Sequence, residues 1–372
     1  GVATKAVKLF HQKTKKKLTL EECVKIVSVL AYMESFKEIV KTVDNQGLLV
    51  NLAKNSIPEN FMEQTKKFEL NKNEVERAVT CFRETQLAQD LNWLLSSRLQ
   101  IAGLDKQQAD TFAQRVTWNS QRYIKKVLVE VENNQYEQKI KYYIDNWMEE
   151  LDKYKSIDKY LERQINKRLS KKEFKESFTC KDIYVPLKAQ PLDNNGQRDK
   201  NKLPVDLEDW TKKLLQADDK QDKVIFIQGY PGRGKSLFCL MFANWVKENL
   251  HPLWTPILIY LRDIETIEKQ FENTLKSVVN GDFVANDNGW LTDKNTRYLF
   301  LLDGFDELVM EGRNSGLEDF LRQVGRFQED CQQNMDERGH RILITGRTLA
   351  LQTNGTKKSR KTYGLSCLQF ST

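Results

Sequence analysis

The stretch GYPGRGKS at Gly229–Ser236 constrains how the second half of the chain can fold. It fits the pattern GxxxxGK followed by Ser or Thr, comes after the apolar run Val224–Gln228 and precedes apolar residues at helical spacing. A strand before this motif and a helix after it are the context that the pattern requires. Glycines in such a loop let backbone N–H groups curl around a polyphosphate at the positive end of the helix. The stretch therefore predicts a phosphate-binding loop.

Residues 223–372 are predicted to form an α/β domain around this loop. Three more short apolar runs, rich in β-forming residues, follow the first, and the segments between them are long enough for crossover helices. Continuous apolar strands of this kind are typical of a parallel sheet covered by helices on both faces. The four predicted strands are Val224–Gln228, Ile257–Leu261, Tyr298–Leu302 and Ile342–Thr345.

The loop supplies the expected contacts to the phosphates. Lys235 would place its ammonium on the β- and γ-phosphates, and the Ser236 hydroxyl would ligate Mg²⁺. Arg233 lies inside the loop, and the sequence leaves open whether it contacts a neighbouring subunit or solvent. The predicted nucleotide-binding residues of the loop are Gly229, Pro231, Gly232, Arg233, Gly234, Lys235, Ser236 and Leu237.

Carboxylates follow the third predicted strand. Asp303 comes directly after it, and a carboxylate at the end of a neighbouring parallel strand is placed to bind Mg²⁺ beside the phosphates. We therefore expect Asp303 to be a metal ligand together with Ser236. One of Asp306 and Glu307, a turn further on, is expected to orient or deprotonate an attacking water. A solvated acidic loop is the alternative interpretation.

A cation follows the fourth predicted strand. Arg347 comes after Gly346 at the end of that strand. A guanidinium pairs with phosphate oxygens in a fixed fork geometry, so Arg347 is expected to face the γ-phosphate and to act with Asp306 and Glu307 in catalysis. A surface arginine is the alternative.

Residues 1–175 are predicted to form an all-helical domain. Apolar residues recur there at helical spacing, and glycine and proline are nearly absent between residues 19 and 170. Five or six helices with short turns favour antiparallel packing. Weaker periodic segments lie at 136–153 and 156–169, and the second helix is expected to continue through Leu94. Three capping boxes open helices, at Thr19 with Glu22, Asn71 with Glu74 and Asp105 with Gln108.

Residues 176–222 are predicted to be a linker. Pro186, Pro191 and Pro204 lie close together, and Asp193–Gln197 has the composition of a turn. A short amphipathic segment around Trp210 then leads into the next domain.

Composition limits the classes of function. The 372 residues carry a formal net charge of +7, a basic excess too dilute to require nucleic acid. No apolar run is long enough for a membrane helix and no N-terminal signal is present, so a cytoplasmic protein without a membrane partner is expected. The six cysteines and three histidines show no metal-binding spacing.

Three motifs together resemble a known family. They are GYPGRGKS at Gly229–Ser236, LFLLDGFDEL at Leu299–Leu308 and ILITGR at Ile342–Arg347. Their combination is similar to the NACHT group of STAND ATPases, the signal-transduction ATPases with numerous domains, in particular its bacterial and cyanobacterial members. In that group a small residue follows the metal-binding aspartate, and paired acids come two positions on, as in DGFDE here. The likeness covers about residues 178–347 and does not extend to the helical half.

The resemblance implies a P-loop NTPase core that binds ATP or ADP with Mg²⁺ and hydrolyses ATP slowly. It also implies a switch between a closed ADP-bound monomer and an open ATP-bound homo-oligomer. The helical domain would then be an effector or adaptor with an unknown protein target, and bacterial members often act in antiviral defence against phage. In the family a segment ahead of the phosphate loop contacts adenine, and Tyr184 and Val185 lie in the segment that resembles it here.

Family members continue beyond the arginine strand into a winged-helix domain and a ligand-sensing array. Only 25 residues follow Arg347 here, and the tail Thr348–Thr372 shows no convincing strand–helix unit. On this resemblance, either the chain is a fragment or short form whose NTPase domain, 223–372, is C-terminally incomplete, or its tail no longer follows the family pattern.

Two other functions stay open on the sequence. The helical half could be a nucleic-acid or protein interaction module with the ATPase domain as a passive nucleotide-binding anchor, and steeply salt-dependent binding would favour the nucleic-acid version. A remodelling or motor ATPase is a weaker alternative, because the split acidic motif argues against it.

Overall fold

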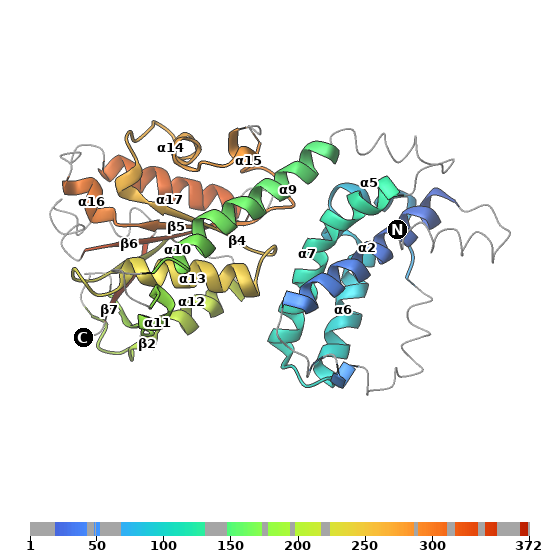
Figure 1. The fold of residues 1–372 in the computed structure, drawn as a ribbon, viewed down its shortest axis with the longest axis horizontal. Helices are drawn as coiled ribbons and strands as arrows, with labels where there is room; N and C mark the ends of the chain where they lie inside the picture. Colours follow the sequence, from blue (N-terminus) through green and yellow to red (C-terminus); the bar gives the residue numbers. More distant parts are fainter. Residues whose placement is uncertain are drawn as a thin grey trace. The chain divides into compact units, whose positions relative to one another are not determined.

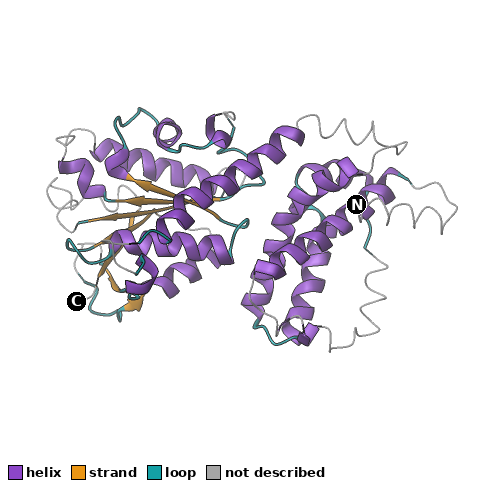
Figure 2. Ribbon diagram, in the orientation of Figure 1, coloured by secondary structure: helices purple, strands orange, loops and turns teal. Residues whose placement is uncertain are grey.

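The computed structural model describes residues 19–42, 48, 50–52, 68–130, 147–172, 178–193, 198–216, 224–285, 289–310, 317–333, 339–347 and 365–370. The chain divides into two units, Gly1–Tyr154 and Lys155–Thr372. The first is helical and the second is built on a sheet, as Figure 2 shows. Within the described ranges, no helix combines the length and the apolar character needed to cross a membrane.

Helices of the first unit begin at the predicted capping boxes. Thr19 N–H donates to Glu22 Oε2 at 2.8 Å and Glu22 N–H donates to Thr19 Oγ1 at 3.2 Å, which opens α2. Asp105 and Gln108 exchange the same pair of bonds ahead of α7. The described helices of this unit are α2 (Leu20–Thr42), η1 (Lys72–Glu74), α5 (Val75–Thr80), η2 (Phe82–Glu84), α6 (Gln86–Ile101) and α7 (Lys106–Glu130), with the start of α9 (Trp147–Leu161).

The second predicted helix is broken near residues 81–85, so its expected continuation through Leu94 was wrong. Gln121 of α7 stabilises the break, because its side chain accepts from Phe82 N–H at 3.0 Å and donates to Val79 O. Thr85 then caps α6 by accepting a backbone N–H three residues on at 3.2 Å. A tertiary contact therefore overrides the helical spacing of the apolar residues.

A shared apolar core holds α2, α6 and α7 together. Val24, Val27 and Ala31 of α2 are fully buried, as its periodicity predicts. Ser35 Oγ donates to Val116 O at 2.7 Å and ties α2 to α7 through a buried polar contact.

The second unit contains one seven-stranded sheet in the order β2-β1-β7-β3-β6-β5-β4. Strands β7, β3, β6, β5 and β4 run parallel, β1 is antiparallel to β7, and β2 is antiparallel to β1. The strands are β1 (Lys188–Pro191), β2 (Val205–Asp206), β3 (Val224–Gln228), β4 (Thr255–Tyr260), β5 (Tyr298–Asp303), β6 (Arg341–Gly346) and β7 (Leu365–Phe370).

Helices cover both faces of this sheet. Figure 1 shows α13 and α17 on opposite sides of the strands, and β3, β5 and β6 are buried along their whole length. The predicted α/β core with four parallel strands is thereby confirmed. The remaining helical elements are η3 (Glu162–Asn166), a π-helical turn, α10 (Lys167–Leu169), α11 (Cys180–Ile183), α12 (Leu207–Gln216), α13 (Lys235–Asn249), η4 (Leu261–Asp263), α14 (Phe271–Val278), α15 (Asp282–Ala285), α16 (Phe305–Met310) and α17 (Leu317–Gln333).

The structure adds three strands that the sequence did not predict. The tail, in which the sequence showed no convincing strand–helix unit, forms strand β7 beside β3, because the open edge of β3 provides a parallel hydrogen-bonding partner for it. The predicted linker supplies β1, β2 and α12, so much of 176–222 belongs to the second unit. The unit also begins at Lys155, earlier than the expected boundary at 175. The weak helical segment 136–153 lies largely outside the described residues.

Candidate nucleotide-binding site

The loop between β3 and α13 has the backbone that its glycines predict. Gly232 has φ 71° and Gly234 has φ 80°, in the left-handed region that costs a non-glycine residue about 1–2 kcal/mol. Gly229 N–H donates to Gly346 O at 3.1 Å, which ties the start of the loop to the end of β6. Pro231, Gly232, Arg233 and Ser236 are exposed, Leu237 is partly buried, and the loop is therefore open to a ligand.

Lys235 begins α13 and folds back into the loop. Its Nζ donates to Gly229 O at 3.0 Å and to Tyr230 O at 3.1 Å. Burial lowers the pKa of Lys235, and the nearby carboxylates of Asp306 and Asp303 act against that shift. The ammonium is thus placed between the loop carbonyls and the acids that follow β5.

Asp303 ends β5 and is buried, with 4% of its surface exposed. Thr345 Oγ1 donates to Asp303 Oδ1 and accepts from Gly304 N–H at 3.2 Å. One carboxylate oxygen is thereby fixed by a neighbouring strand. Sequence reasoning missed Thr345, although a hydroxyl directly before Gly346 at a strand end was a signal for it.

Asp303 does not lie on the strand next to the loop, as the sequence-based prediction had it. Strand β6 lies between β3 and β5, so Asp303 is two strand spacings from the loop, each about 4.8 Å. The carboxyl ends of parallel strands still meet at one edge of the sheet. The Lys235 ammonium, although bonded to the loop carbonyls, is within electrostatic reach of Asp303 and Asp306.

Asp306 and Arg347 form a two-point contact at this edge. Arg347 Nε lies 2.6 Å from Asp306 Oδ2, and Arg347 N–H donates to Asp306 Oδ1 at 3.0 Å. The Asp306 side chain is 12% exposed and that of Arg347 is 41% exposed. The contact fixes the first residue after β6 against α16 and leaves part of the guanidinium accessible.

Glu307 packs back against the turn that follows β5. Gly304 has φ 87°, a backbone conformation that favours glycine, and a Cβ at this position would lie 3.0 Å from Glu307 Oε2, a close approach. Burial raises the pKa of Glu307, and Arg262 acts against that rise while Asp303 and Asp306 add to it. Asp306 uses both of its carboxylate oxygens to contact Arg347. Glu307 is therefore the better candidate for the acid that acts on a water molecule.

The segment ahead of the loop lies beside the loop's last glycine. A Cβ at Gly234 would lie 3.7 Å from Leu187 Cδ1, so the chain at 184–187 borders the phosphate loop. Val185 is 70% exposed, whereas Tyr184 is partly buried. Burial raises the pKa of Tyr184, and the neighbouring Glu208 carboxylate adds to the rise. Val185 is therefore open to contact a base, and the Tyr184 phenol faces Glu208.

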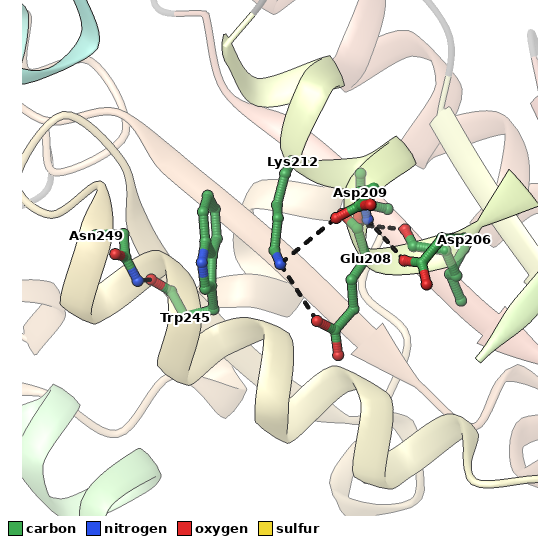
Figure 3. A network of polar contacts seen from close by, with 8 residues as sticks. Asp206, Glu208, Asp209, Lys212, Trp245 and Asn249 are labelled. Carbon is green, nitrogen blue, oxygen red and sulfur yellow. Dashed lines mark hydrogen bonds and ion pairs between the residues drawn. The ribbon is translucent and has the colours of Figure 1, made fainter. Parts of the chain in front are cut away.

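A polar network holds α12 against α13 (Figure 3). Lys212 Nζ lies 3.3 Å from Glu208 Oε2 and 5.0 Å from the centroid of the Trp245 ring. Asp206 caps α12 by accepting from Asp209 N–H at 3.0 Å. The helix beside Tyr184 is thus held against the helix that starts at the phosphate loop.

The donor set fits a nucleotide with Mg²⁺. Backbone N–H groups at the start of a helix bind phosphate, and Mg²⁺ prefers one or two carboxylates with a hydroxyl and substrate phosphates to an all-protein cage. Asp303 and Ser236 provide such oxygens. Across the residues that the structure places, no group of three or more His, Cys, Asp or Glu side chains forms a metal-binding set of its own.

A comparison with protein families gave a match in the N-terminal part of the chain. Residues 1–180 match the family model NNH3, the NACHT N-terminal Helical domain 3. This match supports a NACHT-family protein, and it involves residues outside the three motifs at Gly229–Ser236, Leu299–Leu308 and Ile342–Arg347. A search of the curated proteins found no match.

Proposed function

We propose that this chain is an ATP-binding signalling switch of the NACHT group of STAND ATPases. ATP–Mg²⁺ binding and slow hydrolysis would control homo-oligomerisation and the activity of the helical unit. The observation that carries the proposal is the gathering of Lys235, Asp303 and Arg347 at the carboxyl ends of parallel strands. If the glycine loop binds a triphosphate, these cations and this carboxylate would lie near its γ-phosphate end.

The loop residues would bind the phosphates by position and charge. The backbone N–H groups of 229–236 and the Lys235 ammonium would contact the β- and γ-phosphates, with Lys235 exchanging its loop carbonyls for phosphate oxygens. Asp303 and Ser236 would hold Mg²⁺, which when bound neutralises charge that develops on the phosphate oxygens. Val185 would contact the base.

Hydrolysis would use the residues after β5 and β6. Arg347, oriented by Asp306, would pair with the γ-phosphate through the exposed part of its guanidinium. Glu307 would act as the general base, because its raised pKa brings it closer to the pH at which a base is effective.

The helical unit would be the effector or adaptor of the switch. Its match to a NACHT N-terminal helical domain supports this role, and bacterial antiphage defence is the setting that we propose. Expression of the full chain in bacteria should then lower phage plaque counts, and Lys235→Ala should restore them. Equal plaque counts for the two proteins would contradict the role in phage defence, and would leave the nucleotide-dependent switch to be tested separately.

Sedimentation velocity and phosphate release test the switch on the full chain. With ATP–Mg²⁺ the wild type should sediment faster than with ADP or without nucleotide, and it should release phosphate slowly. Lys235→Ala should show neither effect, whereas Lys213→Ala, which removes an exposed lysine of α12, should behave as the wild type. Identical sedimentation in all three conditions would contradict the oligomeric switch.

A further inference from the structure

The segment Lys155–Leu169, which we call the docked segment, is fixed to the sheet unit by polar contacts. Ser156 Oγ accepts from Phe283 N–H at 2.9 Å. Lys247 Nζ of α13 donates to Asn166 Oδ1 in η3. The docked segment is therefore held at both ends, by the chain around α15 and by the helix that begins at the phosphate loop.

The docked segment ends beside Tyr260, the last residue of β4. Arg168 Cζ lies 4.5 Å from the centroid of the Tyr260 ring, and Arg262 Cζ lies 5.1 Å from the same centroid. Such cation–π contacts strengthen when the groups are shielded from water. Burial raises the pKa of Tyr260 and Arg168 acts against that rise, so its guanidinium also influences the phenol oxygen.

Tyr260 borders the candidate nucleotide site. In the parallel register of β4 and β5 it is the partner of Asp303, the proposed Mg²⁺ ligand. Asp303 also adds to the rise in the pKa of Tyr260, which places the two side chains within electrostatic reach. Arg262, the other cation at the Tyr260 ring, lies in η4, which packs against α16, the helix that carries Glu307. The ring contacts of Tyr260, its register with Asp303 and the packing of η4 on α16 thus connect Arg168 to the elements that carry both acids.

We propose that Arg168 is a positioning residue of this site, which acts through Tyr260 and Arg262 on Asp303 and Glu307. Occupation of the site by ATP–Mg²⁺ and docking of Lys155–Leu169 are thereby coupled. The inference rests on the proposed nucleotide-binding function and adds a route by which the site is connected to the chain that leads from the helical unit. Because coupling between two binding events is reciprocal, tighter docking strengthens nucleotide binding and nucleotide strengthens docking.

Titration of ATP into the full chain, with and without Mg²⁺, tests the coupling. Arg168→Gln should weaken binding in Mg²⁺ by about fivefold or more, the lower end of measured couplings, and leave binding without Mg²⁺ unchanged. Lys159→Gln is the matched control, because Lys159 lies in the same segment and its side chain is exposed. It should leave both affinities unchanged. Arg168→Lys, which keeps the charge and loses the planar group, should recover part of the loss.

Hydrogen exchange gives a readout that does not depend on turnover. Saturating ATP–Mg²⁺ should slow amide exchange across 155–169 in the wild type and not in Arg168→Gln. A purely structural role would instead lower the melting temperature of Arg168→Gln without changing the Mg²⁺ dependence of ATP affinity, and that result would overturn the inference.

The two proposals fail in different ways. A wild type that does not bind ATP under either condition overturns both. A wild type that binds, a Lys235→Ala variant that does not, and an Arg168→Gln variant that matches the wild type in affinity and exchange would overturn only the coupling.

Discussion

Arg347 and Asp306 are paired through both carboxylate oxygens of Asp306, one on the Arg347 side chain and one on its backbone N–H. The pair joins the end of β6 to the start of α16 at the edge of the sheet where the phosphate loop lies. It assigns different roles to two adjacent acids, because Asp306 orients the arginine and Glu307 remains the candidate base.

Substitutions at this pair should be strongly non-additive. Asp306→Asn and Arg347→Gln each remove the same side-chain ion pair, so the double variant should lose less stability than the sum of the two single variants. We expect an interaction energy of about 0.5–1 kcal/mol, at the low end for contacting residues because Arg347 is partly exposed. Chemical denaturation of the four proteins measures it, and additive losses would show that the pair does not act as a unit.

Glu307→Gln should reduce ATP hydrolysis by about 10²–10⁴-fold and leave ATP affinity unchanged, because it removes the base without changing the phosphate contacts. Single-turnover phosphate release and a binding titration separate the two effects. Asp306→Asn should lower both the rate and the stability, which distinguishes an orienting acid from a base.

The rate of ATP hydrolysis should increase with pH. The pKa of Glu307 is raised, mainly by burial, and only the ionised form accepts a proton. Hydrolysis should therefore increase with pH as Glu307 ionises, above the ordinary range for a glutamate. Glu307→Gln should abolish this rise, and a variant that keeps the same pH profile would rule out Glu307 as the base.

Asp303→Asn should weaken Mg²⁺-dependent turnover more than nucleotide binding, because the amide is a poor Mg²⁺ ligand and the loop contacts are retained. The comparison is ATP affinity and phosphate release over a Mg²⁺ series. Asp319→Asn, an exposed acid of α17, is the control and should match the wild type. An unchanged Mg²⁺ requirement in Asp303→Asn would remove Asp303 from the metal site.

Gln121→Leu should destabilise the helical unit by about 1–3 kcal/mol, because it leaves the buried Phe82 N–H and Val79 O without their partner. Gln107→Leu, at an exposed position of the same helix, should change stability by less than about 0.5 kcal/mol. Urea unfolding followed by circular dichroism tests the difference. Equal stability of the two variants would mean that this contact does not stabilise the break between α5 and α6.

Local signals predicted the parts of the fold that are encoded locally. Capping boxes at Thr19 and Asp105 fixed the starts of helices, and apolar runs such as Tyr298–Leu302 located the central strands. Both kinds of signal depend on residues that are close together in the chain, so they can be recognised in a single sequence. The phosphate loop could be predicted for the same reason, because its glycines allow the left-handed backbone conformation that the loop needs.

The parts that were missed depend on contacts across the fold. Strand order placed β6 between β3 and β5, and no pattern within either strand specifies its neighbours. Strands β2, β1 and β7 extend the sheet from the open side of β3, and their pairing depends on that available strand edge. Thr345, Tyr260 and Arg262 became site residues only because the register brings strand ends together.

Isothermal titration of ATP with Mg²⁺ into the full chain tests the phosphate-loop assignment most directly. The wild type and Lys213→Ala should bind with equal affinity, and Lys235→Ala should lose at least about a hundredfold, or about 2.7 kcal/mol. Equal affinity of Lys235→Ala and wild type would contradict the assignment of 229–236 as the nucleotide site.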